Sequence, residues 1–298
     1  KQTPGYNRMG IKFIRSILRM KALNKNKSHV CLFLTFILIF TSSLPRVASA
    51  QDNTNTFTPD ENWFEAAKKD FNTWPDRIWE DSVYTFTDNG NLMALLLAGG
   101  GSIAMHNTSA DDTVAENMAD ARTFDNNFFD EGFNFLGSPG THFAATGLWY
   151  ALAHEKGDQL NKDRAWTMTT ALAITGMTTL GLKAIRNNDT PNGKSWAWPS
   201  GHTSSSFAVA SVLDEFYGPQ IGIPAYAAAS LVGWRMMDVG DHWASDVLFG
   251  GTLGWVVGHS VAGKHKKVEL AGWRVTPYFG NYNVKEGTCM GLSLSKQF

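Results

Sequence analysis

Six stretches of mostly apolar residues, each long enough for an α-helix, dominate the chain between residues 91 and 262. Polar or Gly/Pro-bearing linkers such as "EKGDQLNKD" separate them, a pattern that predicts a bundle of helices. The stretches are rich in Ala, Gly, Ser and Thr, whose small side chains let helices approach closely. The predicted helices span 91–106, 141–155, 164–185, 201–217, 221–236 and 242–262.

The same apolar stretches favour a soluble bundle over one that spans a membrane. None is an unbroken run of about 18 apolar residues, the length that indicates a membrane helix. Several also contain a polar break. A polytopic membrane protein is the alternative interpretation.

Different patterns flank the predicted bundle. Residues 51–90 begin as a polar segment and continue as an amphipathic mixture of aromatic and charged residues, a rough helical period that we expect Pro75 to interrupt. Residues 266–298 alternate and have a Gly/Asn-rich middle, which predicts a short β-hairpin packed against the bundle. The expected fold is therefore all-α: a six-helix bundle core in a domain over residues 91–265, with a C-terminal hairpin.

Residues 1–50 have the three-part layout of a secretory signal. Lysines follow Met20, then comes the apolar core "VCLFLTFILIF", and small residues end at Ala50, where we expect cleavage. The apolar core is shorter than the roughly 20 residues that a membrane span needs. We therefore expect an exported protein, in the periplasm of a bacterial envelope, with a membrane-embedded protein as the alternative.

The charge of the chain changes when this signal is set aside. Residues 1–50 hold nine of the 26 Lys and Arg residues and none of the 27 Asp and Glu residues. The remainder has 17 basic and 27 acidic residues, so its net charge is −10 rather than the −1 of the whole chain. Such an acidic chain is not expected to bind nucleic acid, because that binding depends on Lys and Arg neutralising phosphates. Any phosphate chemistry must come from a few cations in one pocket.

The first candidate site is the turn "PSGH" at the start of a predicted helix. Ser200 can cap that helix, and Gly201 lets the backbone approach a ligand. The first N–H groups of a helix have no partner within it and lie at the positive end of its dipole, so they form an anion site beside His202. The alternative is an ordinary helix cap followed by an unrelated histidine.

Two further segments carry candidate chemistry. His242 and Asp246 are four residues apart, so on a helix they share a face, and the carboxylate can accept a ring N–H and make the other ring nitrogen a better nucleophile. Arg235 offers a planar fork of donors that matches phosphate oxygens. Lys183 lies near the end of an otherwise apolar helix. Each has a structural alternative: a hydrogen bond between helical neighbours, or a cation at a helix C-terminus.

The order and spacing of these segments resemble the three-part signature of the type-2 phosphatidic acid phosphatase superfamily. That signature reads K-x(6)-R-P, then P-S-G-H, then S-R-x(5)-H-x(3)-D, and its members include lipid phosphatases, bacterial class A acid phosphatases and vanadium haloperoxidases. The resemblance covers roughly residues 91–262. It implies a helical-bundle core in which the three motifs meet at one phosphate pocket.

The resemblance implies an exported phosphatase that needs no metal or other cofactor and acts on a lipid phosphate or a small soluble phosphoester or diphosphate. His242 is expected to attack phosphorus and form a phosphohistidine, Asp246 to orient its ring, and His202 to protonate the leaving oxygen. Association with a membrane is compatible with a lipid substrate. The groups expected to hold the non-bridging phosphate oxygens are Lys183, Ser200, Gly201 and Arg235.

The sequence departs from the family signature in three places. Thr190 stands at the arginine of the first motif, Trp234 stands at the serine of the third, and six residues instead of five separate Arg235 from His242. The missing arginine removes one of the forks that clamp the phosphate.

These departures leave other interpretations open. Arg186 or Lys194 could replace the missing cation, although neither matches the motif. A vanadate-dependent haloperoxidase is one alternative function, and Thr190 counts against it because those members generally carry the arginine. The other is a catalytically degenerate protein that binds a phosphorylated lipid or serves as an envelope scaffold; retention of both histidines counts against it.

Overall fold

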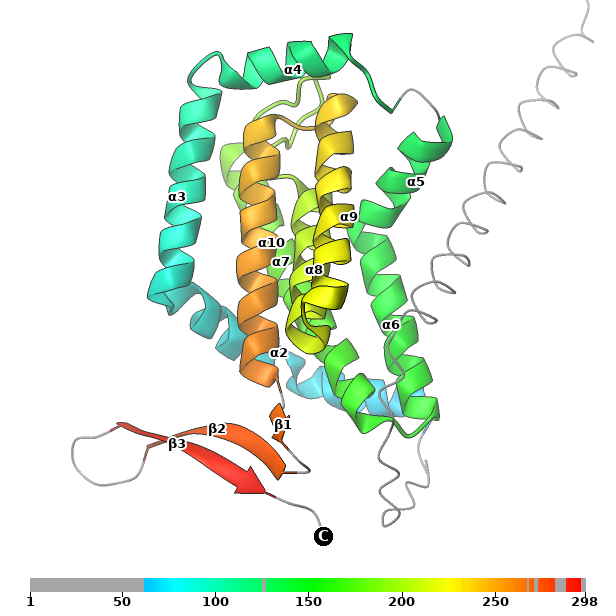
Figure 1. The fold of residues 1–298 in the computed structure, drawn as a ribbon, viewed down its shortest axis with the longest axis vertical. Helices are drawn as coiled ribbons and strands as arrows, with labels where there is room; N and C mark the ends of the chain where they lie inside the picture. Colours follow the sequence, from blue (N-terminus) through cyan, green and yellow to red (C-terminus); the bar gives the residue numbers. More distant parts are fainter. Residues whose placement is uncertain (1–61, 125–126, 267, 271–272, 282–287, 296–298) are drawn as a thin grey trace, which may run out of the picture.

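The computed structural model describes residues 62–124, 127–266, 268–270, 273–281 and 288–295 (Figure 1). The predicted signal in residues 1–50 lies outside the described residues, so export stays a prediction. The polar segment at 51–61 lies outside them as well.

The prediction of an all-α bundle is confirmed, because a helix forms at each of the six apolar stretches. Each of these helices covers most of its predicted range, and their ends differ by a few residues, as helix ends commonly do. The helices are α3 (Asn89–His106), α6 (Pro139–Glu155), α7 (Gln159–Arg186), α8 (Gly201–Tyr217), α9 (Pro219–Asp238) and α10 (Ala244–His265).

Three other described helices surround this core: α2 (Trp63–Thr87), α4 (Ala110–Asp120) and α5 (Asn127–Gly137). The expected interruption at Pro75 is wrong, because α2 continues through it. Pro75 is exposed, and on either side of it Trp74 Nε1 donates to Thr170 Oγ1 at 3.1 Å and Arg77 Nη2 donates to Thr167 Oγ1 at 2.8 Å. These bonds to α7 hold α2 in place although proline removes one helical hydrogen bond.

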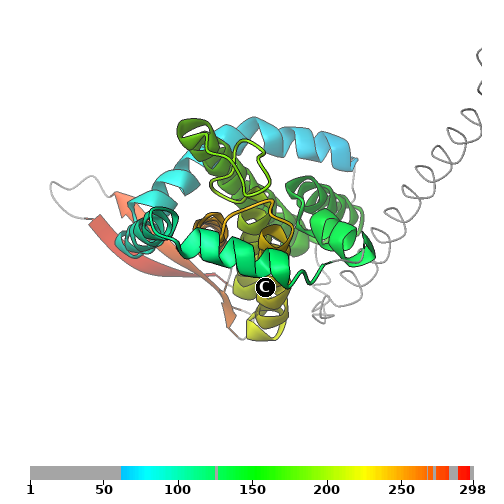
Figure 2. The ribbon, with the colours of Figure 1, turned by 90° about the horizontal axis from the view of Figure 1, so that it is seen from above.

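The helices form an upright bundle that is covered at both ends (Figure 1). Helix α4 lies across the upper end in this view, and α2 lies across the lower end; the view from above shows α4 passing over the tops of the central helices (Figure 2). Within the described part of the chain, no helix combines the length and the apolar character needed to cross a membrane.

The central contact of the bundle is a close approach between α8 and α10. Three glycines of α10, spaced four residues apart, face α8, and a Cβ atom on any of them would meet α8 backbone. At Gly254 that Cβ would lie 2.1 Å from the carbonyl oxygen of Ser204. Gly250 faces Ser200 and Gly258 faces Ala208, so the two helices run in the same direction. Their N-termini therefore meet at the end that α4 covers.

Apolar side chains fill the rest of the space between the helices. Five of the largest fully buried ones come from α7, α8 and α10: Met168, Leu172, Val212, Leu253 and Val257. The segment after α10 forms three antiparallel strands in the order β1–β2–β3: β1 (Val268–Leu270), β2 (Trp273–Asn281) and β3 (Thr288–Ser295). Strands β2 and β3 pair along their length, with Thr276 opposite Ser293.

Candidate active site

The turn that begins α8 is capped as the sequence predicted. Ser200 is the N-cap residue, fully buried, and its Oγ accepts the N–H of Thr203 at 3.4 Å and lies 2.9 Å from the Thr203 hydroxyl. The backbone N–H of Ser200 donates to the carbonyl oxygen of Asp246 at 3.1 Å. The turn is thus fixed directly against the start of α10, with the first N–H groups of α8 left for an anion.

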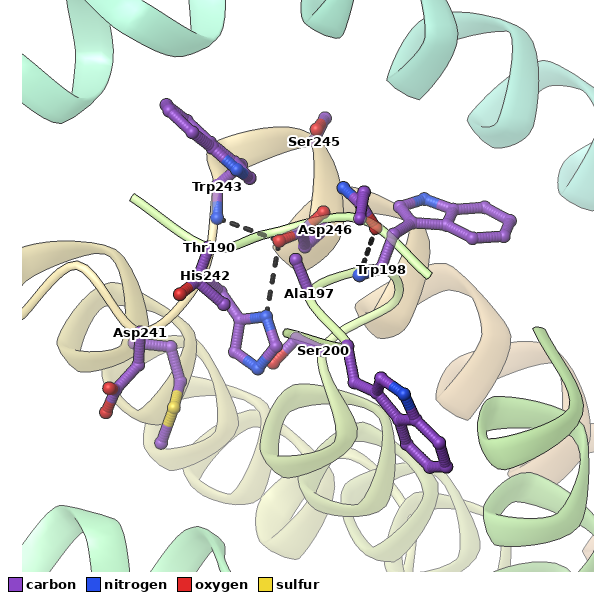
Figure 3. Close-up of polar contacts among 12 residues, drawn as sticks. Thr190, Ala197, Trp198, Ser200, Asp241, His242, Trp243, Ser245 and Asp246 are labelled. Atoms are coloured by element: carbon purple, nitrogen blue, oxygen red, sulfur yellow. Dashed lines mark hydrogen bonds and ion pairs between the residues drawn. The ribbon is translucent and has the colours of Figure 1, made fainter. Parts of the chain in front are cut away.

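His242 and Asp246 are in contact, but not through a shared helical face. His242 lies in the bend before α10, whereas Asp246 lies in its first turn. The Nδ1 atom of His242 is 3.2 Å from Oδ2 of Asp246, and the same oxygen accepts the backbone N–H of Trp243 at 2.9 Å (Figure 3). Because Asp246 occupies Nδ1, the other ring nitrogen, Nε2, is left for chemistry.

Lys183, in the last turn of α7, holds the loop that leads into the Ser200 turn. Its Nζ donates to the carbonyl oxygens of Trp196 and Ala197, the latter at 3.0 Å. Burial lowers the pKa of Lys183 to about 8, against the opposing effect of the Asp246 charge. An ammonium group has three donors, so one N–H of Lys183 is left for a ligand.

Arg235, in the last turn of α9, is buried between two carboxylates. Its Nε donates to Oδ1 of Asp130 at 2.7 Å, and its Nη1 donates to Oδ2 of Asp241 at 2.7 Å. Among the described residues, Nη2 of Arg235 has no hydrogen-bond acceptor. Asp130 lies on α5, which the sequence did not predict, and Asp241 lies in the segment lengthened by one residue. The guanidinium group is therefore oriented, with one nitrogen left to donate.

His202 lies in the first turn of α8, two residues after the N-cap residue Ser200. Burial lowers its pKa to about 4, and the nearby positive charges of His242, Arg235 and Lys183 add to this effect, while Asp241 opposes it. Lys183 binds the loop that precedes Ser200, and the N–H of Ser200 donates to Asp246, the partner of His242. The structure therefore brings all three motifs to one place.

A second buried histidine, His142, lies on α6. Burial and the charge of His202 lower the pKa of His142 to about 4. Its Nδ1 is buried and has no hydrogen-bond partner among the described residues. Sequence reasoning did not include His142 in the candidate site, because nothing in the spacing of the motifs relates α6 to the Ser200 turn.

Helix α4 is tied to the start of α10 by a buried carboxylate. Asp111 accepts the backbone N–H of Ser245 at 3.0 Å and its hydroxyl at 2.6 Å, and it lies 3.2 Å from Nδ1 of His106. Ser245 directly precedes Asp246, so this contact fixes the helix turn that carries the partner of His242. The mainly polar sequence of α4 gave no apolar periodicity from which this helix could be predicted.

The arrangement can support the transfer of a phosphoryl group. It has a histidine nitrogen backed by a carboxylate, a second histidine nearby, two cationic side chains and the N-terminus of a helix. Among the described residues, no cluster of three or more His, Cys, Asp or Glu side chains is arranged to hold a metal ion.

Comparison with known proteins relates this region to one superfamily. The sequence model of the PAP2 superfamily matches residues 178–268, a range that contains all of the predicted catalytic and phosphate-binding residues. A lipid A 1-phosphatase from Porphyromonas gingivalis is 40% identical over 65 residues. That match covers 21% of this chain and 15% of the relative, so the chain aligns with only a small part of the relative's length.

Two crystal structures are similar in fold. LpxE from Aquifex aeolicus has a TM-score of 0.46 and 20% identity, and the alignment covers 53% of this chain and 97% of that protein. A transmembrane PAP2-type phosphatidylglycerolphosphate phosphatase from Bacillus subtilis has a TM-score of 0.45 and 22% identity, covering 61% of this chain and 94% of that one.

Proposed function

Because residues 178–268 match the PAP2 superfamily, we propose that the protein is a phosphatase that removes a phosphate group from a phosphorylated lipid. One observation carries the proposal: Asp246 contacts Nδ1 of His242 and, through its carbonyl oxygen, binds the Ser200 turn that begins the helix of His202. A nucleophile, an acid and an anion site are the parts that this reaction needs.

In the first step, Nε2 of His242 attacks phosphorus while the bond from phosphorus to the lipid oxygen breaks. Asp246 holds the Nδ1–H of the ring and stabilises the positive charge that the imidazole acquires. His202 gives its proton to the leaving oxygen. The products of this step are the dephosphorylated lipid and a phosphohistidine.

In the second step, water attacks the phosphohistidine. His202, now neutral, takes a proton from the water, and the bond between phosphorus and His242 breaks. Inorganic phosphate leaves, and both histidines return to their starting states. The charge on the non-bridging oxygens is stabilised throughout by Lys183, by Nη2 of Arg235 and by the first N–H groups of α8.

The charge of the substrate matters for the acid. The pKa of His202 is about 4 in the absence of a ligand, chiefly because of burial and in part because of the positive charges of Arg235 and Lys183. A bound phosphate brings negative charge into the same pocket and so raises the pKa of His202. Substrate binding therefore helps His202 to hold the proton that it donates.

The elements that carry the candidate site also carry large exposed apolar side chains, and these support a lipid substrate. Ile185 is 83% exposed two residues after Lys183, and Trp234 is 46% exposed directly before Arg235. Trp196, whose carbonyl oxygen accepts a bond from Lys183, is 47% exposed. Exposed apolar side chains on the elements that carry the candidate site suit a substrate with acyl chains at the surface of a membrane. The lipid A 1-phosphatase relative supports the same class of substrate. That relative and the predicted signal also support a location in the cell envelope.

Phosphate release from a panel of phospholipids, lipid A and soluble esters tests this proposal. We expect release from a lipid with a chelator present, inhibition by vanadate, and a loss of at least about 1,000-fold in kcat for His242→Ala, because a nucleophile is removed. His259→Ala is the matched control, since this histidine is 52% exposed and pairs with Glu215. Full activity of His242→Ala would rule out the phosphohistidine. Vanadate binding without any turnover would instead indicate a phospholipid-binding protein.

A further inference from the structure

We propose that Lys194 supplies the phosphate-binding cation that the first motif lacks at Thr190. The inference rests on the proposed phosphatase function and names the group that completes its phosphate site. Four observations support it: the turn between these two residues, the carboxylate that holds Lys194, the balance of charge in the site, and the position of the other candidate cation.

The chain turns back on itself between Thr190 and Lys194. The N–H of Thr190 donates to the carbonyl oxygen of Lys194 at 2.8 Å, and the N–H of Lys194 donates to Oγ1 of Thr190 at 2.9 Å. Gly193 has a φ of +79°, which glycine adopts without strain, and its N–H donates to the carbonyl oxygen of Thr190. The turn thus returns Lys194 to the place in space where the first motif ends.

The side chain of Lys194 points to the same carboxylate as Arg235. Its Nζ lies 2.8 Å from Oδ1 of Asp241, and Nη1 of Arg235 lies 2.7 Å from Oδ2 of that residue. Asn192 adds a third bond, from Nδ2 to Oδ1 of Asp241 at 2.8 Å. Two cations on one carboxylate lie within a few ångströms of each other, and Asp241 directly precedes His242. Lys194 is therefore held on the same carboxylate as Arg235, a predicted phosphate-binding residue.

The charges in the site also require another cation. Three carboxylates contact the arginine or the nucleophile, whereas Lys183 and Arg235 are the cations of the predicted set. Without Lys194 these charges sum to −1, which repels a phosphate; with it they balance. The side chain of Lys194 is 70% exposed, so it can move from the carboxylate to an incoming phosphate oxygen. The three carboxylates are Asp130, Asp241 and Asp246.

The other candidate cation, Arg186, is directed elsewhere. Its guanidinium carbon lies 5.5 Å from the centre of the Trp198 ring, a cation–π contact. Trp198 in turn packs against Phe249 and donates from Nε1 to Ser102 at 2.9 Å, so the ring belongs to the bundle interior. Arg186 is therefore occupied by the Trp198 ring, whereas Lys194 shares a carboxylate with Arg235 of the candidate site.

The test compares four variants of the full-length protein. Lys194→Met removes the charge, Lys194→Arg keeps it, Arg186→Met removes the competing candidate, and Lys156→Met is an exposed control at the C-cap of α6. Two quantities are measured for each: kcat/KM for the lipid phosphate that the wild type hydrolyses best, and the dissociation constant of inorganic vanadate by calorimetry. We expect Lys194→Met alone to lower kcat/KM and to weaken vanadate binding, each by about 10- to 100-fold, the effect of one charge-assisted hydrogen bond. Lys194→Arg should restore most of both.

The outcomes separate this inference from the proposed function. Unchanged vanadate affinity and kcat/KM in Lys194→Met would overturn the role of Lys194, and a loss confined to Arg186→Met would assign it to Arg186 instead. A wild type that binds vanadate but hydrolyses no ester would end the proposed function, while the ratio of vanadate affinities would still decide the role of Lys194. A wild type that binds no vanadate would overturn both.

Discussion

Replacing Gly254 by alanine tests whether the close contact of α8 and α10 sets the geometry of the site. The added Cβ would lie 2.1 Å from the carbonyl oxygen of Ser204 and 2.8 Å from the backbone nitrogen of Ala208. Ordinary contact begins at 3.4 Å, and both neighbours are backbone atoms that no rotamer change can move. The helices must therefore separate by roughly 1 Å or more, since the interior is close-packed.

We expect two consequences of Gly254→Ala. Overpacking of this kind costs about 1–3 kcal/mol of unfolding free energy, which corresponds to a melting temperature lower by about 2–12 °C for a protein of this size. The separation also moves His202, on α8, away from His242, which precedes α10. A displacement of about 1 Å in an active site can cost 100-fold in rate, so kcat should fall by about 10- to 100-fold.

Thermal unfolding by circular dichroism and phosphate release by the same protein samples measure these effects. The matched control is Gly263→Ala, in the same helix, where an added Cβ meets nothing within 4 Å. That variant should be stabilised by up to about 0.5–1 kcal/mol, because alanine favours a helix over glycine, and its kcat should not change. If Gly254→Ala behaved like Gly263→Ala in both measurements, the contact would not control the site.

Two predictions concern pH. The pKa of Lys183 is lowered to about 8 by burial, so the side chain is charged below that pH and neutral above it. Inhibition of the wild type by inorganic phosphate should therefore weaken as the pH rises past 8. In Lys183→Arg the inhibition should persist to higher pH, because arginine stays charged. His142 and His202 each have a pKa lowered from 6.5 to about 4 in the folded state, so the unfolded state binds more protons between pH 4 and 6.5. Stability in urea should therefore fall as pH decreases from 6.5 to 4, and less steeply in His142→Asn; an equal slope in both proteins would contradict the burial of a neutral His142.

The helical core could be predicted from sequence because its signal is local. Long apolar stretches broken by polar linkers indicate buried helices whatever their partners are. The helices that cover the core have a weaker signal: α4 is polar along most of its length, and it is held by contacts such as the one from Asp111 to Ser245, which are distant in sequence. The interruption expected at Pro75 is absent for a related reason, since tertiary contacts on both sides of it outweigh one missing hydrogen bond.

The candidate site was predictable where a motif states both residue type and spacing. His202, His242 and Asp246 follow from "PSGH" and H-x(3)-D, although the contact of His242 with Asp246 arises from the bend before α10 rather than from a helical face. The surroundings of Arg235 were not predictable, because Asp130 comes from a helix more than 100 residues earlier. Asp241 lies in the segment that is one residue longer than in the family signature, and its role depends on where the loop places its carboxylate.

The parallel packing of α8 and α10 has a consequence for the origin of the anion site. Two helix N-termini converge on the pocket, and each carries a partial positive charge of about half an elementary charge that comes from aligned peptide groups. The pocket is thus polarised by the main chain as well as by side chains. This part of the attraction does not titrate, needs no rotamer to be selected and is not removed by replacing any single lysine or arginine. A fold whose backbone retains an affinity for phosphate can tolerate threonine at position 190, where the family signature has an arginine.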